Sequence, residues 1–153
     1  MSVTIEGPHL GKASVCALIL RSLPDWFGIE EDLVMYEAEI EHLPTFLACE
    51  AENVVGFLSI KQHSVYSAEI LVVGVKTEAH RRGIGRALVD KAQEWLRTQH
   101  IEYLQVKTLG PSNSDESYAK TRNFYLAMGF RPLEEFKQIW DEQNPCLILI
   151  KRL

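Results

Sequence analysis

The feature that most constrains the fold is an apolar run that leads into a basic, glycine-containing loop and then into a helical pattern. The run from Ala68 to Val75 reads AEILVVGV, and the stretch from His80 to Arg86 reads HRRGIGR. A strand this apolar is typical of the centre of a sheet, covered on both faces. From Ile84 to about Thr98, apolar residues recur on one helical face. We therefore predict a central strand followed by a loop and a long helix.

The remaining patterns predict the order strand, one or two helices, three strands, helix, strand, helix, two strands. Val3–Ile5 is the first predicted strand, and a helix with Val15, Leu18 and Ile19 on one side follows it. The segment 30–40 fits either a helix or a loop. The later elements are expected at Thr45–Ala51 and Val54–Ile60 with a hairpin turn at Glu52–Asn53, then Tyr103–Thr108, Glu116–Met128 ended by Gly129, extended chain from Phe130, and Cys146–Ile150. This order predicts the α+β class, or α/β with three layers, built on one central sheet.

Composition narrows the classes of protein. The chain has 153 residues, which suits a single domain spanning 1–153. Its net charge of −5 argues against a nucleic-acid partner. We expect a cytoplasmic protein with no membrane segment, because the sequence contains neither a signal-peptide pattern nor an apolar run of membrane-spanning length. Cys16, Cys49 and Cys146 are expected to be reduced thiols, and no metal is expected.

The basic loop is suited to binding an anion. The first backbone N–H groups of a helix have no partner within the helix and carry partial positive charge. Gly83 and Gly85 would let a phosphate approach these groups closely. Arg81, Arg82 and Arg86 would add charge-assisted hydrogen bonds.

Several interpretations of the loop compete. A nucleoside-triphosphate loop ends in Gly-Lys-Ser/Thr, which this stretch lacks, and a dinucleotide loop needs a third glycine where Leu88 stands. A pyrophosphate loop for coenzyme A has neither requirement. Alternatively, the two glycines only shape a turn between strand and helix.

The stretch from His80 to Gly85 resembles the acetyl-CoA signature of the GNAT superfamily of N-acetyltransferases, Gln/Arg-x-x-Gly-x-Gly/Ala. The segment RNFYLAMGFRP, Arg122 to Pro132, resembles the late helix of that family. The resemblance implies a mixed, mostly antiparallel, splayed central sheet of six to seven strands with about four helices. His80 departs from the signature, and Tyr118 stands where the family often has an Asn that contacts the pantetheine arm.

By resemblance, acetyl-CoA is the acyl donor, and the N–H group of Val73 binds the thioester oxygen. The resemblance implies these cofactor-binding residues: Val73, Val75, Arg81, Arg82, Gly83, Ile84, Gly85, Arg86 and Tyr118.

Two residues are candidates for proton transfer. Tyr125 is the candidate acid for the coenzyme A sulfur, and its alternative role is a core aromatic beside Phe124. Glu69 is the candidate general base, because an isolated carboxyl in an apolar strand can have a raised pKa. An ordered water could serve as base instead, with Glu69 facing solvent at the end of the strand.

The resulting hypothesis is an acetyl-CoA-dependent N-acetyltransferase, an acyltransferase that acts on a primary amine of a small molecule or protein by direct attack in a ternary complex. Alternatives are a non-catalytic acyl-CoA-binding sensor and a nucleotide-binding regulatory domain. Trp26, Phe27 and His63 are candidates for the acceptor pocket. Both a monomer and a homodimer remain open.

Overall fold

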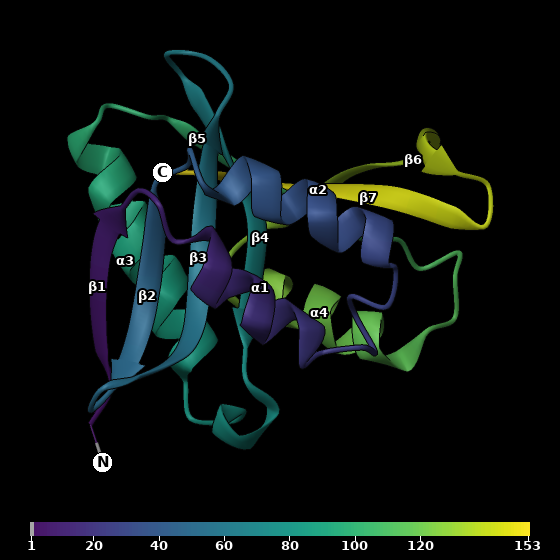
Figure 1. Cartoon of the computed structure of the whole chain (residues 1–153). Coiled ribbons are helices and arrows are strands. Elements are labelled where there is room, and N and C mark those ends of the chain that lie inside the picture. The colour runs from purple at the N-terminus through teal and green to yellow at the C-terminus, as the bar shows by residue number, and fades with distance from the viewer. Residues whose placement is uncertain (1) are drawn as a thin grey trace. The chain divides into compact units, whose positions relative to one another are not determined.

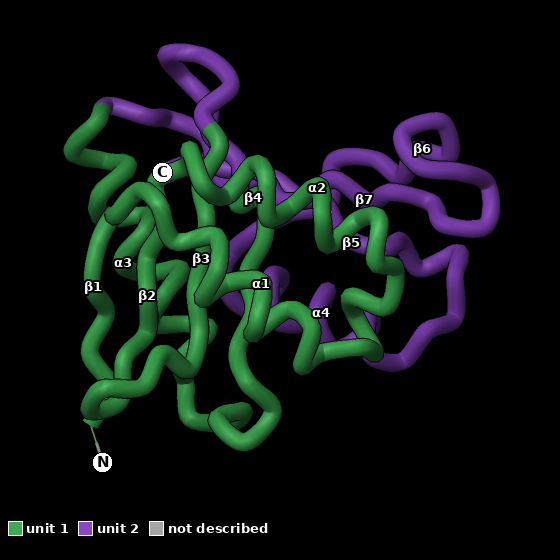
Figure 2. The backbone as a smooth tube through the Cα atoms, viewed as in Figure 1, with its two compact units in different colours: residues 1–61, 70–99 green, residues 62–69, 100–153 purple. Residues whose placement is uncertain are grey.

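The computed structural model describes residues 2–153, and the chain divides into two compact units (Figure 2). Unit 1 contains the chain up to Lys61 together with Ile70–Gln99. Unit 2 contains Gln62–Glu69 and His100–Leu153. The β4 strand, Ser67–Val75, begins in unit 2 and continues in unit 1.

The predicted order of elements is confirmed, and the segment 30–40 is a helix (Figure 1). Residues 2–153 contain seven strands and four α-helices, so the α+β class is confirmed as well. The elements of the first part of the chain are β1 Thr4–His9, α1 Ala13–Arg21, α2 Glu30–Ile40, β2 Thr45–Glu50, β3 Asn53–Gln62, β4 Ser67–Val75, a short 3₁₀ turn η1 Thr77–Ala79 and α3 Ile84–Thr98. The later elements are β5 Tyr103–Leu109, α4 Glu116–Ala127, β6 Arg131–Asp141 and β7 Asn144–Arg152.

Antiparallel pairing dominates in both units. In unit 1 the hydrogen-bonded order is β1-β2-β3-β4, with β2 antiparallel to both β1 and β3. In unit 2 the order is β5-β7-β6, and both pairs are antiparallel. The mostly antiparallel sheet is therefore confirmed, while the splay implied by the resemblance stays a prediction.

The α1 helix packs on the sheet of unit 1 through a face that differs from the predicted one. Cys16, Ile19 and Leu20 are buried in a cluster with Phe57, whereas Leu18 is 70% exposed. Positions three and four apart share a helix face, and Leu18 lies about 200° around the helix from Cys16. The prediction that placed Leu18 beside Ile19 was therefore wrong, because Cys16 was not counted among the apolar residues.

The hairpin turn lies one residue earlier than predicted. Glu50 pairs with Asn53, so the turn consists of Ala51 and Glu52. Ala51 has a φ of 55°, which matches the positive φ that two-residue hairpin turns require. Asn53 is the first paired residue of β3 rather than a turn residue.

The β4 strand is buried on one face and half-buried on the other, which corrects the expectation of full cover on both. Ile70 and Val72 are buried, whereas Leu71, Val73 and Val75 are half-buried. Successive side chains of a strand point to opposite faces, so the alternation means that one face is less well covered.

In unit 2, the α4 helix contacts β5 and ends at Ala127, one residue before the predicted end, with Met128 as its C-cap and Gly129 at a φ of 95°. Leu104 and Val106 on β5 and Leu149 on β7 are buried. None of the helices found within residues 2–153 has the length and apolar character needed to cross a membrane.

Candidate functional site

The α3 helix of unit 1 begins with an open N-terminus. Its N-cap is Gly83, with a φ of 73° in the left-handed region that favours glycine. No side chain caps this end, and the first turn contains no acidic residue. A Cβ at Gly83 would meet nothing within 4 Å. The uncapped N–H groups and the space beside them fit a phosphate group.

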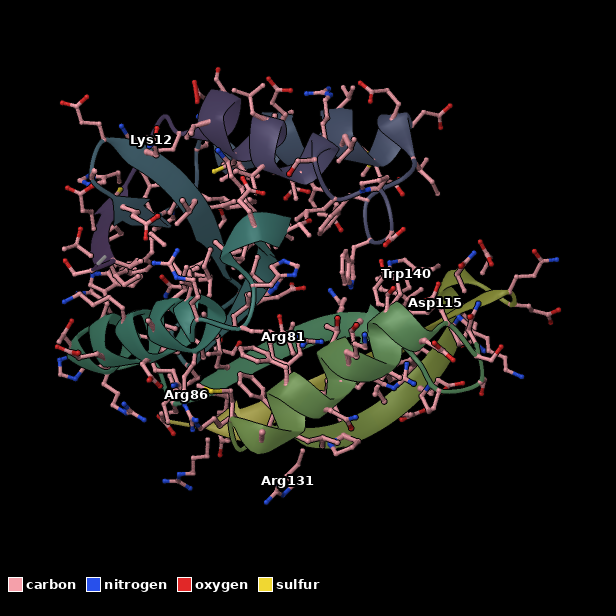
Figure 3. All side chains as sticks on the ribbon, turned by 90° about the horizontal axis from the view of Figure 1, so that it is seen from below. Lys12, Arg81, Arg86, Asp115, Arg131 and Trp140 are labelled. Atoms are coloured by element: carbon pink, nitrogen blue, oxygen red, sulfur yellow. The ribbon has the colours of Figure 1, made fainter. Side chains whose placement is uncertain are left out.

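The arginines around this helix end differ in their surroundings. Arg81 precedes Gly83 with a φ of 64°, Arg86 lies in the first turn of α3, and both are exposed (Figure 3). Arg82 forms an ion pair with Glu50, which ends β2. The hydrogen bond from Arg82, followed by its charge, holds the pKa of Glu50 below its ordinary value. Local sequence patterns could not indicate this pairing, because the two residues lie 32 positions apart.

The side chain of His80 is tied to the end of β4. Its Nε2 lies 2.7 Å from the carbonyl oxygen of Val75, to which it donates a hydrogen bond. The ring of Trp26 meets the His80 ring edge-on, at 6.0 Å between centroids. The resembled signature has Gln or Arg at this position. Here the histidine anchors the loop to the strand, and its hydrogen bond uses the carbonyl oxygen of Val75 as acceptor. Trp26 and Phe27 also pack against the core of unit 1.

The candidate base Glu69 lies in unit 2 and is buried, with 3% of its surface exposed. His63 Nε2 lies 2.7 Å and Lys107 Nζ 3.4 Å from the same oxygen, Oε1. The alternative in which Glu69 faces solvent is therefore wrong. Both contacts use Oε1, which leaves Oε2 to accept a proton.

Neither partner of Glu69 was predicted, although the sequence contained a signal for one of them. His63 directly follows β3, and Lys107 is a charged residue inside the apolar strand β5. A lysine at such a position needs a partner, and a carboxylate on a neighbouring strand is the usual one. Cys146 of β7 lies close enough to Lys107 and Glu69 for the charges of both side chains to affect its thiol. Burial raises the Cys146 pKa to about 11, with smaller opposing effects from Lys107 and Glu69.

The candidate acid Tyr125 lies on α4 and is 2% exposed. Its ring packs edge-on against Phe124 at 5.2 Å and against Phe130 at 5.4 Å. Burial raises the pKa of its hydroxyl above the ordinary value, so the phenol keeps its proton. A raised pKa makes the phenol a weaker acid, so proton donation to the sulfur stays a prediction, whereas the ring packs as a core aromatic.

Tyr118 lies in the first turn of α4. The side chain of Asp115, labelled in Figure 3, caps this helix by accepting hydrogen bonds from the Ser117 and Tyr118 N–H groups. Across residues 2–153, no group of three His, Cys, Asp or Glu side chains is arranged to hold a metal ion.

The comparisons with known proteins agree on one family. The acetyltransferase (GNAT) family profile matches residues 13–130. An N-acetyltransferase of Chlorobaculum tepidum, described as uncharacterized, is 31% identical over 111 residues, which cover 70% of this chain and 64% of that protein. The match thus leaves more than a third of the relative's length uncovered.

Solved structures show the same fold. A GNAT-family acetyltransferase from Desulfovibrio desulfuricans has a TM-score of 0.85 at 17% identity, with 99% of both chains covered. A GNAT-family acetyltransferase from Elizabethkingia anophelis with acetyl-CoA bound has a TM-score of 0.72 at 17% identity, covering 99% of this chain and 98% of that one.

A family match over most of the chain, together with a shared fold, defines the class of this protein. The chain belongs to the acetyltransferase (GNAT) family.

Proposed function

We propose that this protein is an N-acetyltransferase that moves an acetyl group from acetyl-CoA to a primary amine by direct attack in a ternary complex. The observation that carries the proposal is the uncapped N-terminus of α3 with open space at Gly83, within a chain of the acetyltransferase family. The similar fold that binds acetyl-CoA supports the choice of donor.

In the proposed site, the backbone around Gly83 and the side chains of Arg81 and Arg86 bind the diphosphate. Gly85 and the buried Ile84 lie in the first turn of α3 and supply its N–H groups. Arg82 contributes less than the sequence suggested, because its charge is already paired with Glu50. Tyr118 and the backbone of Val73 and Val75 remain proposed contacts for the pantetheine and acyl portions.

Acetyl-CoA supplies the acetyl group as an activated thioester. The amine must lose a proton in order to attack, because an alkyl ammonium has a pKa of about 10.4 and no lone pair. Glu69 is proposed to take this proton on Oε2, directly or through a water. The Val73 N–H is proposed to stabilise the charge that develops on the acyl oxygen. Tyr125 is proposed to give its proton to the departing sulfur when the carbon–sulfur bond breaks, and the second proton that the nitrogen loses as the amide forms restores the phenol.

The experiment is a screen of coenzyme A release from acetyl-CoA across a panel of amines, with coenzyme A binding measured separately by calorimetry. Binding together with release for at least one amine supports the enzyme. Binding without release for any amine supports the acyl-CoA sensor, and failure to bind coenzyme A contradicts both. ATP or NAD competing with coenzyme A would instead favour a nucleotide-binding domain. A cytoplasmic location and a small-molecule or protein acceptor remain part of the proposal.

A further inference from the structure

One face of the sheet in unit 2 carries a small pocket. Gln105 pairs with Ile150 and Lys107 with Ile148 across β5 and β7. Directly opposed residues share a face, so these four side chains lie on the face opposite Leu104 and Leu149. The pocket on this face has a volume of about 270 Å³, and its lining includes Tyr103, Gln105, Leu133, Ile148 and Ile150.

The pocket is suited to an uncharged group. None of its seven lining residues carries a charge, and most of them present hydrocarbon. An ammonium or carboxylate placed there loses hydration without gaining a charged partner from the lining. Pockets for drug-sized ligands have volumes of roughly 300–1,000 Å³, so this one suits a smaller group.

The pocket adjoins the proposed base. Ser67 and Ala68 contribute to its lining, and Glu69 is the next residue of β4. On the other side, Lys107 lies directly across from the lining residue Ile148. The buried Glu69 carboxylate and the Lys107 ammonium, 3.4 Å apart, offset each other's charge. A nearby cation also favours the neutral form of an incoming amine, which is the form that attacks.

We propose that this pocket holds the hydrocarbon group of the acceptor, so that the acceptor is a primary amine whose remainder is small and uncharged. The inference rests on the proposed function and narrows its substrate class. It disfavours polyamines and aminoglycosides, because these carry further ammonium groups into an uncharged pocket.

The test compares two acceptors with the same hexyl carbon chain, hexylamine and 1,6-diaminohexane, by their kcat/KM for coenzyme A release. We expect hexylamine to be preferred by at least about tenfold, because the diamine must place a second ammonium in the pocket. Equal kcat/KM values for the two amines, or a preference for the diamine, would overturn the proposal.

A charge-introducing variant tests whether the pocket causes the preference. Leu133 is 60% exposed, so Leu133→Glu is compatible with folding. Its carboxylate should shift the kcat/KM ratio toward the diamine by at least about threefold. Leu126→Glu, at a 38% exposed position on α4, is the matched control and should leave the ratio unchanged. If Leu133→Glu leaves the kcat/KM ratio of the two amines unchanged, the pocket does not take part in acceptor recognition.

Two further measurements separate this inference from the proposed function and from self-association. If no amine is acetylated, the proposed function fails, and the pocket is tested alone by NMR. Hexylamine should then shift the amide signals of Ile148 and Ile150, and unchanged signals would contradict the pocket.

Sedimentation tests the remaining occupant, a second copy of the chain. A dimer that Leu133→Glu converts to monomer would overturn the proposal, since the face would then be an interface.

Discussion

At the scale of single residues, the best-defined group is the Glu69 carboxylate with its two partners. It is buried, and both partners contact Oε1, so the position of Oε2 is fixed. A side chain held from two directions is pre-organised, because its rotamer freedom is already lost when substrate binds.

Replacing Glu69 with Gln should lower kcat/KM by about a hundredfold, which is within the usual range for loss of a general base. The loss should be largest at low pH, where the amine is protonated and needs a base most. Profiles of kcat/KM against pH measure this, with Glu102→Gln at an exposed position as the control. Unchanged kcat/KM at low pH would end the assignment of Glu69 as base.

His63 is expected to be a positioning residue that acts through Glu69. Histidine changes charge near neutral pH, and a protonated His63 opposes proton uptake by Glu69. Lys107 and Cys146 also face this carboxylate. His63→Gln, neutral at every pH, should therefore move the acidic limb of the kcat/KM profile to higher pH, because Glu69 loses a neighbouring cation that favours its charged form. If His63→Gln lowers kcat/KM equally at every pH and the acidic limb does not move, the role of His63 is purely structural.

Tyr125→Phe should lower kcat by about tenfold to a hundredfold, because the leaving sulfur would lose its proton donor. The phenylalanine ring can keep the packing against Phe124 and Phe130, so the Tm should change little. Stopped-flow turnover and thermal unfolding measure the two effects. Full turnover across the pH range would remove Tyr125 from the chemistry and leave it a core residue.

At the scale of the elements, the N-terminus of α3 is the feature on which the proposed cofactor site depends. Gly83→Asp should raise the Kd for coenzyme A by at least about tenfold, because its carboxylate would occupy the anion position at the helix end. Gly11→Asp is the matched control, since Gly11 also has a φ of 73° and nothing within 4 Å of an added Cβ. Equal effects of the two variants on the Kd, measured by calorimetry, would contradict a diphosphate at α3.

The helices and strands also show which features could be predicted from the sequence. The order of helices and strands and the start of α3 at Ile84 follow from local periods and from glycines that break them. The buried face of α1 was partly mispredicted, because Cys16 rather than Leu18 faces the sheet. Glu69 was recognised as a candidate because it is an isolated carboxyl in an apolar strand, and Tyr125 because of the resemblance of its helix, whereas the burial of both side chains depends on contacts distant in sequence.

At the scale of the whole molecule, the buried thiols make stability depend on alkaline pH. Burial raises the pKa of Cys16 to about 12 and that of Cys146 to about 11. The folded protein therefore keeps protons that the unfolded chain loses above about pH 8.5. This contribution is complete below that pH and is lost as the pH rises toward the folded values.

The free energy of unfolding should accordingly fall above about pH 8.5, with Cys16 contributing up to about 1.4 kcal/mol per pH unit. Urea unfolding between pH 8 and pH 10.5 measures the slope. Cys16→Ala serves as the control and should make the slope shallower. A free energy of unfolding that rises with pH across this interval would contradict burial of these thiols.

The sequence alone determined the succession of elements and the open, basic start of α3, because periodicity, glycine and the unpaired N–H groups of a helix end act within a few residues. Only the tertiary structure decided which charged side chains form ion pairs with one another. Arg82 is paired with Glu50, and Glu69 is paired with Lys107, which lies 38 positions away. Such pairs depend on which strands lie side by side and which faces are buried, and local sequence does not encode either.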